Sequence, residues 1–151
     1  MSTENRPAVE RLSREHLGAV VEIERLCFSE PWSANALELL LSSEAVGFVA
    51  LSNGQVAAYG GMLWAPDEGQ ITNVAVHPDH RREGLGRAVL DALLLEAARC
   101  GALEVSLEVR ESNEAAIGLY TQAGFFVAGR RKRFYRDPAE DALVMLKTIG
   151  A

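Results

Sequence analysis

The sequence is poor in the residues that mark secreted, metal-binding and membrane-spanning proteins. Its 151 residues include two cysteines and three histidines. Cys27 and Cys100 lie far apart and form no Cys-x-x-Cys pair, so we expect no disulfide framework, no metal site and two reduced, mostly structural thiols. No segment approaches the roughly 20 apolar residues that span a bilayer, and residues 1–6 lack the apolar core of a signal peptide. A cytoplasmic protein without a membrane partner is therefore predicted.

Cations are also few relative to anions. The 15 lysines and arginines are outnumbered by 21 aspartates and glutamates, which gives a net charge of −6. A protein of this charge is not drawn to nucleic acid, so we expect no nucleic-acid partner for the molecule as a whole. With 48% hydrophobic residues and no repeat or long linker, the chain suits a single domain over residues 1–151. We expect a monomer with one core and one binding site.

Hydrophobic periodicity predicts an α/β protein with a mixed sheet. β-rich runs predict strands, Asn53-Gly54 between two of them signals a hairpin, and apolar residues at helical spacing predict helices. The predicted strands are Val9–Leu12, Val46–Leu51, Gln55–Trp64, Gln70–Val76, Leu103–Val109, Phe125–Tyr135 and Ala142–Thr148, and the predicted helices run from a Ser13 cap to Leu26, from a Ser33 cap to Leu41, from Leu85 to Cys100, and from a Ser112 cap over Asn113–Ala123. Leu103 and Cys100 are both predicted on apolar faces.

The most informative segment is residues 74–87, where an apolar strand runs into a basic, glycine-bearing turn that opens a helix. Gly84 and Gly86 allow backbone N–H groups to approach an anion closely, and a helix start adds roughly half a positive charge. The flanking arginines add cations. A local basic loop on an acidic protein indicates a small anionic ligand such as a pyrophosphate.

Two other phosphate-binding motifs do not fit this turn. A P-loop requires Gly-Lys-Ser/Thr, whereas Gly86 is followed by Arg87-Ala88. A dinucleotide-binding fold has a third glycine where this chain has Val89, and its ribose-binding acid follows a strand, whereas Glu104 begins one. Nucleoside triphosphates and dinucleotides are therefore not the expected ligands.

The pattern Arg81-x-x-Gly84-x-Gly86 resembles the acetyl-CoA signature of the GNAT superfamily of N-acetyltransferases. Further motifs look like the RimI branch, which acetylates the N-terminal alanine of a ribosomal protein; they are Phe28-Ser29-Glu30-Pro31-Trp32-Ser33, Asn73-Val74-Ala75-Val76, Leu107-Glu108-Val109-Arg110, Ser112-Asn113-x-x-Ala116-x-x-Leu119-Tyr120 and Gly124-Phe125. The resemblance covers nearly the whole chain. It implies the GNAT fold, a mixed, mostly antiparallel sheet of roughly six to seven strands with helices on both faces and a central βαβ unit for acetyl-CoA.

The resemblance also implies which residues bind the cosubstrate acetyl-CoA. The strand backbone over Val74, Ala75 and Val76 would pair with the pantetheine arm. The turn would wrap the pyrophosphate; its residues are Arg81, Arg82, Glu83, Gly84, Leu85, Gly86 and Arg87. Asn113, at the head of the next predicted helix, matches a position that contacts the cofactor in relatives.

Three histidines are given no catalytic role, because no serine or cysteine nucleophile motif accompanies them. His77 and His80 are interpreted as loop residues, although the family usually has an acidic residue where this chain has His77. His16 is interpreted as an ordinary face of the first helix.

Acetyl transfer to an amine requires a base for the amine proton and benefits from an acid that protonates the departing thiolate. By resemblance Glu108 is the base, and its place near the C-terminal end of a strand suits this role. From the pattern alone, Glu108 is equally the third polar residue on an exposed strand face. Tyr120 matches the acid and, by its helical spacing with Ala116 and Ile117, is also a candidate core aromatic. The resemblance implies no metal and no covalent acyl-enzyme.

The resemblance places Phe28, Trp32 and Tyr135 where relatives receive the acceptor, whereas the pattern alone equally predicts a small aromatic core cluster. Acidic loop residues attract a basic N-terminal tail; the candidates are Glu30, Glu44, Asp67 and Glu68. The expected substrate is a protein or peptide with a free N-terminal amine, above all the N-terminal alanine of a ribosomal protein.

Other functions remain open at the level of sequence. A lysine ε-amine or a small amine is the alternative acceptor, and a non-catalytic acyl-CoA sensor would keep the turn without needing Glu108 or Tyr120. Residues 130–135 are more basic than the family pattern, and residues 137–141 depart from it. These departures leave open the acceptor's identity and a contact of this segment with RNA or the ribosome.

Overall fold

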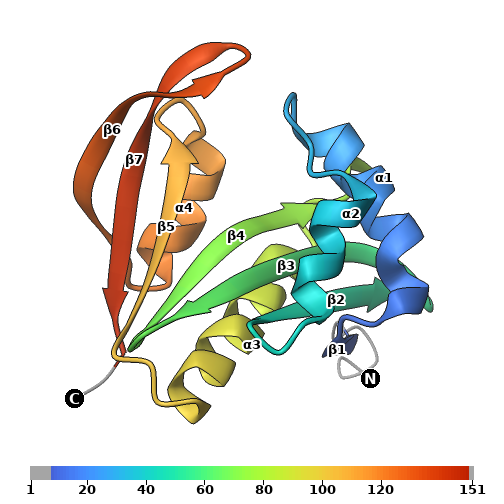
Figure 1. Cartoon of the computed structure of the whole chain (residues 1–151). Helices are drawn as coiled ribbons and strands as arrows, with labels where there is room; N and C mark the ends of the chain where they lie inside the picture. Colours follow the sequence, from blue (N-terminus) through green and yellow to red (C-terminus); the bar gives the residue numbers. More distant parts are fainter. Residues whose placement is uncertain (1–7, 150–151) are drawn as a thin grey trace.

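The computed structural model describes residues 8–149, whose seven strands form one sheet in the order β1-β2-β3-β4-β5-β7-β6 (Figure 1). Neighbouring strands are antiparallel except β4 and β5, which are parallel. The strands are β1 (Ala8–Arg11), β2 (Ala45–Ser52), β3 (Gln55–Ala65), β4 (Glu68–Val76), β5 (Glu104–Arg110), β6 (Phe126–Arg136) and β7 (Ala139–Thr148). The predicted sheet is confirmed. So is the β2–β3 hairpin turn, where Asn53 and Gly54 both have positive φ, 53° and 80°.

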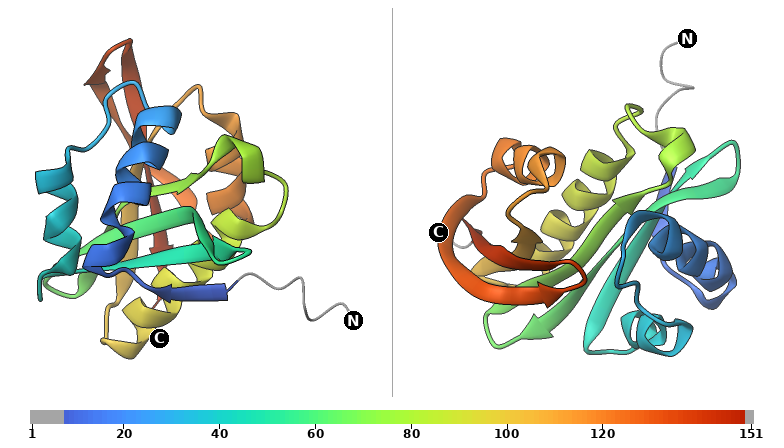
Figure 2. Two further views of the ribbon diagram at one scale, coloured as in Figure 1. Left: turned by 90° about the vertical axis from the view of Figure 1, so that its right-hand side faces the viewer. Right: turned by 90° about the horizontal axis from the view of Figure 1, so that it is seen from above.

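Helices cover both faces of the sheet (Figure 2). α1 (Leu17–Cys27) packs on β3 and β4, and α3 (Leu85–Arg99) crosses the other face over β2, β3 and β4, with α4 (Glu114–Gln122) on the same side as α3. The short helices are α2 (Ala34–Leu37) and the 3-10 helices η2 (Arg14–His16), η3 (Glu38–Leu41) and η4 (Pro78–His80). Among residues 8–149, no helix has the length and apolarity to span a membrane.

Close packing against the sheet fixes the position of α3. Val89, Leu90 and Leu93 are fully buried, and complete burial of each such side chain stabilises the fold by about 1.5–3 kcal/mol. The helix approaches β3 so closely that a Cβ at Gly60 would lie 2.6 Å from Cγ1 of Val89. The basic turn at the start of α3 is therefore held beside the end of β4.

β4 and β5 are paired over only part of their lengths. Glu68–Gln70 of β4 pair with Glu104–Ser106 of β5, whereas β4 continues to Val76 and β5 to Arg110. The two strands separate beyond these pairs (Figure 1). From residue 71 onward, the edge of β4 that faces β5 has no strand partner in the described chain. Backbone N–H and C=O groups need hydrogen-bond partners, so this gap suits an extended polar ligand.

Two residues predicted on apolar faces are exposed in the structure. β5 begins at Glu104, so Leu103 precedes the alternation of the strand and is 53% exposed. Cys100 follows the last residue of α3 and is also exposed. Gly101 ends this helix as predicted, with φ of 84°.

The predicted helix starts are correct in part. Ser33 caps α2, its Oγ accepting from the N–H of Ala36 at 3.1 Å. Ser112 is not the cap of α4, because Oδ1 of Asn113 accepts from Ala116 N at 3.1 Å instead. The predicted first and second helices each contain a 3-10 segment, η2 before α1 and η3 after α2.

His16 is buried rather than on an ordinary helix face. Its Nδ1 accepts from the backbone N–H of Ser13 at 3.0 Å, which draws the ring back over the start of the helix. The interpretation of His16 as an ordinary face of the first helix is therefore corrected: it is a buried residue of the 3-10 turn that precedes α1.

Candidate active site

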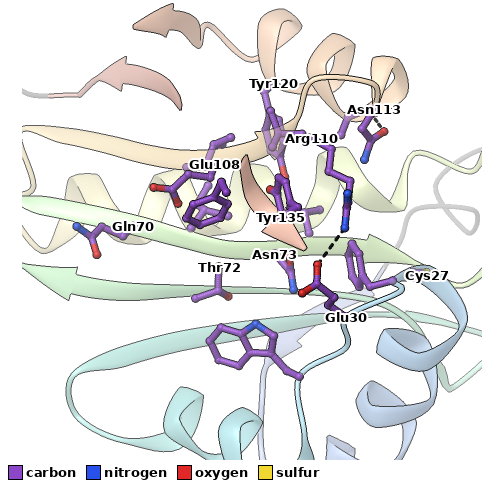
Figure 3. A pocket seen from close by; sticks show the side chains of 18 of the residues that line it. Cys27, Glu30, Gln70, Thr72, Asn73, Glu108, Arg110, Asn113, Tyr120 and Tyr135 are labelled. Carbon is purple, nitrogen blue, oxygen red and sulfur yellow. Dashed lines mark hydrogen bonds and ion pairs between the residues drawn. The ribbon is translucent and has the colours of Figure 1, made fainter. Parts of the chain in front are cut away.

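A pocket of about 500 Å³ opens where β4 and β5 separate (Figure 3). Its walls come from the loop after α1, from β4, from β5, from α4 and from β6. These segments are far apart in the chain and meet because the sheet order places β5 next to β4 and β6 beyond β7. The pocket thus joins the unpaired edge of β4 to polar side chains from the other half of the sheet.

Glu108 and Tyr120 both line this pocket. The Glu108 side chain on β5 is 33% exposed, and its carboxylate lies 3.4 Å from Nε of Arg131 on β6. Tyr120 on α4 is buried and packs edge-on against Phe125. Burial, with a smaller effect of Tyr135, raises the pKa of the Tyr120 hydroxyl, so the phenol keeps its proton at neutral pH. A carboxylate and a protonated phenol therefore border the same cavity.

The three aromatic residues predicted to receive the acceptor also line the pocket. Phe28 and Trp32 are half-buried, and they pack against the core beneath α1 while also lining the cavity. Burial raises the pKa of Tyr135 to about 12, against the opposing effect of Arg110. The guanidinium carbon of Arg110 lies 4.2 Å from the centroid of the Tyr135 ring.

Arg110, near the end of β5, holds two walls of the pocket together. Its Nη2 donates to Glu30 at 3.1 Å and to Oγ of Ser29 at 3.4 Å in the loop after α1. Its Nη1 donates to Glu140 at 3.1 Å and to the carbonyl of Pro138 at 2.8 Å, beside the turn between β6 and β7. The link between Arg110 and Glu30 is drawn in Figure 3. The guanidinium therefore links this loop to the β6–β7 turn, alongside direct bonds from Ser29 Oγ to the carbonyl of Asp137 and from the backbone N–H groups of Arg136 and Asp137 to Glu30.

The glycine-bearing turn lies beyond β4, and none of residues 81–87 lines the pocket. Gly84 caps α3 with φ of 78°, and Arg82 has φ of 69°, a conformation that costs a non-glycine residue roughly 1–3 kcal/mol and is common at ligand sites. A Cβ at Gly84 would meet nothing within 4 Å, whereas a Cβ at Gly86 would lie 3.3 Å from Cγ2 of Val76. Open space therefore lies at the helix start, next to the end of β4, where an anion is favoured.

Two of the three arginines of the turn already have partners within the protein. Arg81 donates to the carbonyl of Val76 at 3.3 Å and to Sγ of Cys27 at 3.5 Å, so it anchors the turn to β4 and α1. Arg87 pairs with Asp91 one turn further along α3. Backbone N–H groups at the start of α3 and the exposed Arg82 are left to meet an anion.

The other predicted cofactor residues divide into two groups. Val74 and Asn113 line the pocket. The side chain of Ala75 is buried in the core beneath α1, so the backbone of this residue is what remains for a ligand. Oδ1 of Asn113 caps α4, which leaves its amide NH₂ as the free polar group of that side chain.

Of the four acids predicted to attract a basic tail, all within the described chain, Glu30 alone lines the pocket. Asp67 and Glu68 lie at the β3–β4 turn, where they line a separate cavity of about 300 Å³. Glu44 precedes β2, and its carbonyl accepts from the N–H of Trp64. Of the four, the structure therefore brings Glu30 alone to the pocket, whereas the other three lie near the β3–β4 end of the sheet.

Sequence reasoning missed two residues that shape the pocket. Arg110 falls within a motif that gives it no role, and nothing in the sequence indicates its partners on distant loops. Glu24 is a fully buried carboxylate behind the pocket. The sequence does contain a sign of this residue: Glu24 falls on the apolar stripe of α1 with Val20 and Ile23, where a charged residue is unexpected.

The comparisons with known proteins agree with the fold. The acetyltransferase (GNAT) family matches residues 17–125. The chain therefore belongs to the acetyltransferase (GNAT) family, a class of N-acetyltransferases. It is 37% identical over 144 residues to ribosomal protein bS18-alanine N-acetyltransferase of Escherichia coli (strain K12), a match that covers 94% of this chain and 97% of that protein.

Two further comparisons lie in the same branch. N-alpha-acetyltransferase RimI of Mycobacterium tuberculosis is 34% identical over 146 residues, covering 92% of this chain and 90% of that protein. The crystal structure of the ribosomal-protein-S18-alanine N-acetyltransferase from Escherichia coli superimposes with a TM-score of 0.89 at 35% identity, covering 97% of this chain and 96% of that one. The resemblance to the RimI branch that the motifs indicated is confirmed.

Proposed function

We propose that this enzyme transfers the acetyl group of acetyl-CoA to the N-terminal α-amine of a ribosomal protein, with alanine of bS18 as the first acceptor to test. The relatives named for this reaction match nearly the whole chain. The observation that carries the proposal is the pocket, where the unpaired edge of β4 meets Glu108 and Tyr120. A ribosomal-protein acceptor would meet the enzyme in the cytoplasm.

The residues present fit acetyl-CoA. The backbone of β4 from residue 71 onward offers N–H and C=O groups to an extended amide chain, except the carbonyl of Val76, which already accepts from Arg81 and Cys27. The N-terminus of α3 offers N–H groups and a positive dipole end to the pyrophosphate. Asn113 and Val74 line the pocket beside the β4 backbone. When bound, acetyl-CoA supplies the acetyl group on a good leaving thiolate.

Two side chains would move the protons. The Glu108 carboxylate takes a proton from the α-amine, whose ordinary pKa of about 8 makes it a far weaker base than lysine, so a modest base suffices. The Tyr120 hydroxyl, which burial keeps protonated, donates a proton to the departing sulfur. Direct attack by the amine then needs no acyl-enzyme.

Mass spectrometry of two peptides tests the proposal. One peptide carries a free N-terminal alanine before basic residues; the other is blocked at its N-terminus and carries an internal lysine. We expect one added acetyl on the first peptide alone. Acetylation of the blocked peptide alone would show that the acceptor is a lysine side chain and not an N-terminal amine. Binding of acetyl-CoA without any acetylated product would favour a non-catalytic sensor.

Two matched variants test the base. Glu108→Gln removes the carboxylate from the pocket, and we expect the rate to fall by about 10²–10⁴-fold, the usual range for a general base. Glu104→Gln changes a partly buried glutamate on the same strand that does not line the pocket, and we expect little change. Equal rates for both variants would remove Glu108 from the mechanism.

A further inference from the structure

Glu24 is a buried carboxylate that the reaction does not use. The residue is fully buried in α1, and no cation in the described chain lies within ion-pair distance of it. It also lies in the last turn of α1, at the negative end of the helix dipole. Carboxylates are almost never fully buried unless paired, and burying one is expensive. A tight set of hydrogen bonds must offset this cost.

Three donors from three different segments converge on this carboxylate. The backbone N–H of Trp32, in the loop after α1, donates to Oε1 at 2.7 Å. Nδ2 of Asn73 on β4 donates to Oε2 at 2.9 Å, and the hydroxyl of Tyr59 on β3 bonds the same oxygen. Burial and the nearby carboxylate raise the pKa of Tyr59, so its hydroxyl keeps the proton that it donates. Glu24 therefore ties a loop to two neighbouring strands of the sheet.

The tied groups belong to the pocket. Asn73, Phe28 and Trp32 all line it, and Asn73 stands on the unpaired part of β4. The first half of the loop is held through Ser29 and Glu30, which bond Arg110 and the backbone of residues 136–137, and the second half is held where Glu24 bonds the backbone of Trp32. The bond to Glu24 fixes the backbone from which the Trp32 ring extends, and the bond from Asn73 ties the same carboxylate to β4.

We propose that Glu24 is a positioning residue for the acceptor side of the pocket. It holds the loop of residues 28–33 against β4, so that Phe28 and Trp32 face the cavity at a fixed distance from Asn73, and it does not itself touch the acceptor. This inference rests on the proposed function for its kinetic consequence, whereas its structural consequence stands alone.

Variants at Glu24 separate positioning from general stability. Glu24→Ala removes the acceptor of all three hydrogen bonds. Glu24→Gln keeps the shape and one acceptor oxygen, while its NH₂ group can donate to the Tyr59 hydroxyl. We expect Glu24→Ala to raise the KM of an N-terminal alanine peptide at least about tenfold, the usual effect of losing one charge-assisted hydrogen bond, with Glu24→Gln in between. The KM of acetyl-CoA should stay within about twofold in both.

A fluorescence readout tests the loop without relying on turnover. The chain has two tryptophans, so in a Trp64→Phe background the emission comes from Trp32 alone. We expect acrylamide to quench Trp32 more strongly in Glu24→Ala and Glu24→Gln than in the parent. Should wild-type enzyme fail to acetylate the alanine peptide, the proposed acceptor fails, and the quenching still decides the role of Glu24.

Two controls complete the test. Tyr59→Phe removes one bond from the same carboxylate outside the pocket, and we expect lower thermal stability with unchanged acceptor KM and unchanged quenching. Glu22→Gln changes an exposed charge on the same helix and should alter nothing. The inference is overturned if Glu24→Gln leaves both acceptor KM and Trp32 quenching at parent values, or if the KM of acetyl-CoA rises in parallel with that of the acceptor. If Glu24→Ala does not fold, Glu24→Gln alone decides.

Discussion

Replacing Arg110 by alanine tests whether one guanidinium holds the acceptor loop and the β6–β7 turn together. The magnitude follows from its partners. The bond to Glu140, a side chain 14% exposed, is sheltered and contributes about 2 kcal/mol. The carbonyls of Asp137 and Pro138, at 3.0 and 2.8 Å, contribute about 1 kcal/mol each. Glu30 is 41% exposed, so solvent screening limits its pair to less than about 1 kcal/mol.

These contributions are not additive, because water replaces part of what is lost. We therefore expect Arg110→Ala to lower the free energy of unfolding by about 2–4 kcal/mol. For a chain of this size that corresponds to a fall in Tm on the order of 10 °C. Because the two pocket walls lose part of what joins them, the KM of the acceptor peptide should rise as well.

Thermal unfolding followed by circular dichroism, with acceptor and acetyl-CoA titrations on the same samples, measures both effects. Arg110→Lys keeps the charge but cannot bridge all five partners, so it should fall between wild type and alanine. Arg25→Ala removes an exposed arginine that pairs with Glu22 and serves as the matched control. A loss below about 0.5 kcal/mol in Arg110→Ala, or a loss equal to that of Arg25→Ala, would refute the reasoning.

Three further predictions follow from other parts of the structure. Tyr120→Phe should lower kcat by about 10²-fold with little change in either KM, because only the proton donor is lost; unchanged steady-state rates would exclude Tyr120 as the acid. Gly84→Ala should cost about 1–2 kcal/mol, since its φ is 78° while the space around it is open, and should weaken acetyl-CoA binding measured by calorimetry; an unchanged Tm would contradict this. The hydrogen bond from Arg99 lowers the pKa of Glu96 in the folded protein below the ordinary pKa of a glutamate. The Glu96 carboxylate therefore stabilises the fold fully when the pH is above the ordinary pKa. This stabilisation is lost as the pH falls through the pKa that Glu96 has in the folded protein. Glu96→Gln should therefore lose up to about 1 kcal/mol at neutral pH, and urea titrations of the two proteins should converge in acid.

Much of the fold was predictable because its signals are local. The alternation of β5, the Asn53-Gly54 turn and the apolar stripe of α3 each report a local backbone preference together with one buried face. The errors fall at element ends, where a tertiary contact overrides the local signal. Ser112 is not the cap of α4: its backbone N–H donates to Glu140 on the distant strand β7, which fixes the chain one residue before the helix start, and Asn113 supplies the cap oxygen.

The candidate site was predictable where chemistry is carried by a motif. Glu108, Tyr120, Phe28, Trp32 and Tyr135 were named from motif positions, and the structure brings all five to one cavity. The supports of that cavity were not predictable in the same way. The partners of Arg110 are as many as 81 positions away in the chain, so no spacing rule connects them. Likewise, whether a predicted acidic residue lies beside the pocket depends on which end of the sheet its turn occupies, and the sequence alone does not give this.

β6 lies at the edge of the sheet, and this position gives its basic residues a second consequence. Nearly every residue of the strand is exposed, and its pairing with β7 is interrupted after Val127 and after Arg131. A free strand edge is a template for pairing with another copy of the chain, and charges and bulges are what oppose such pairing. The positive charges of residues 130–133 thus oppose pairing of this edge with a second copy of the chain. Variants that neutralise them will be prone to aggregate, and a loss of activity in such variants will first report the state of the protein rather than its affinity for an acceptor.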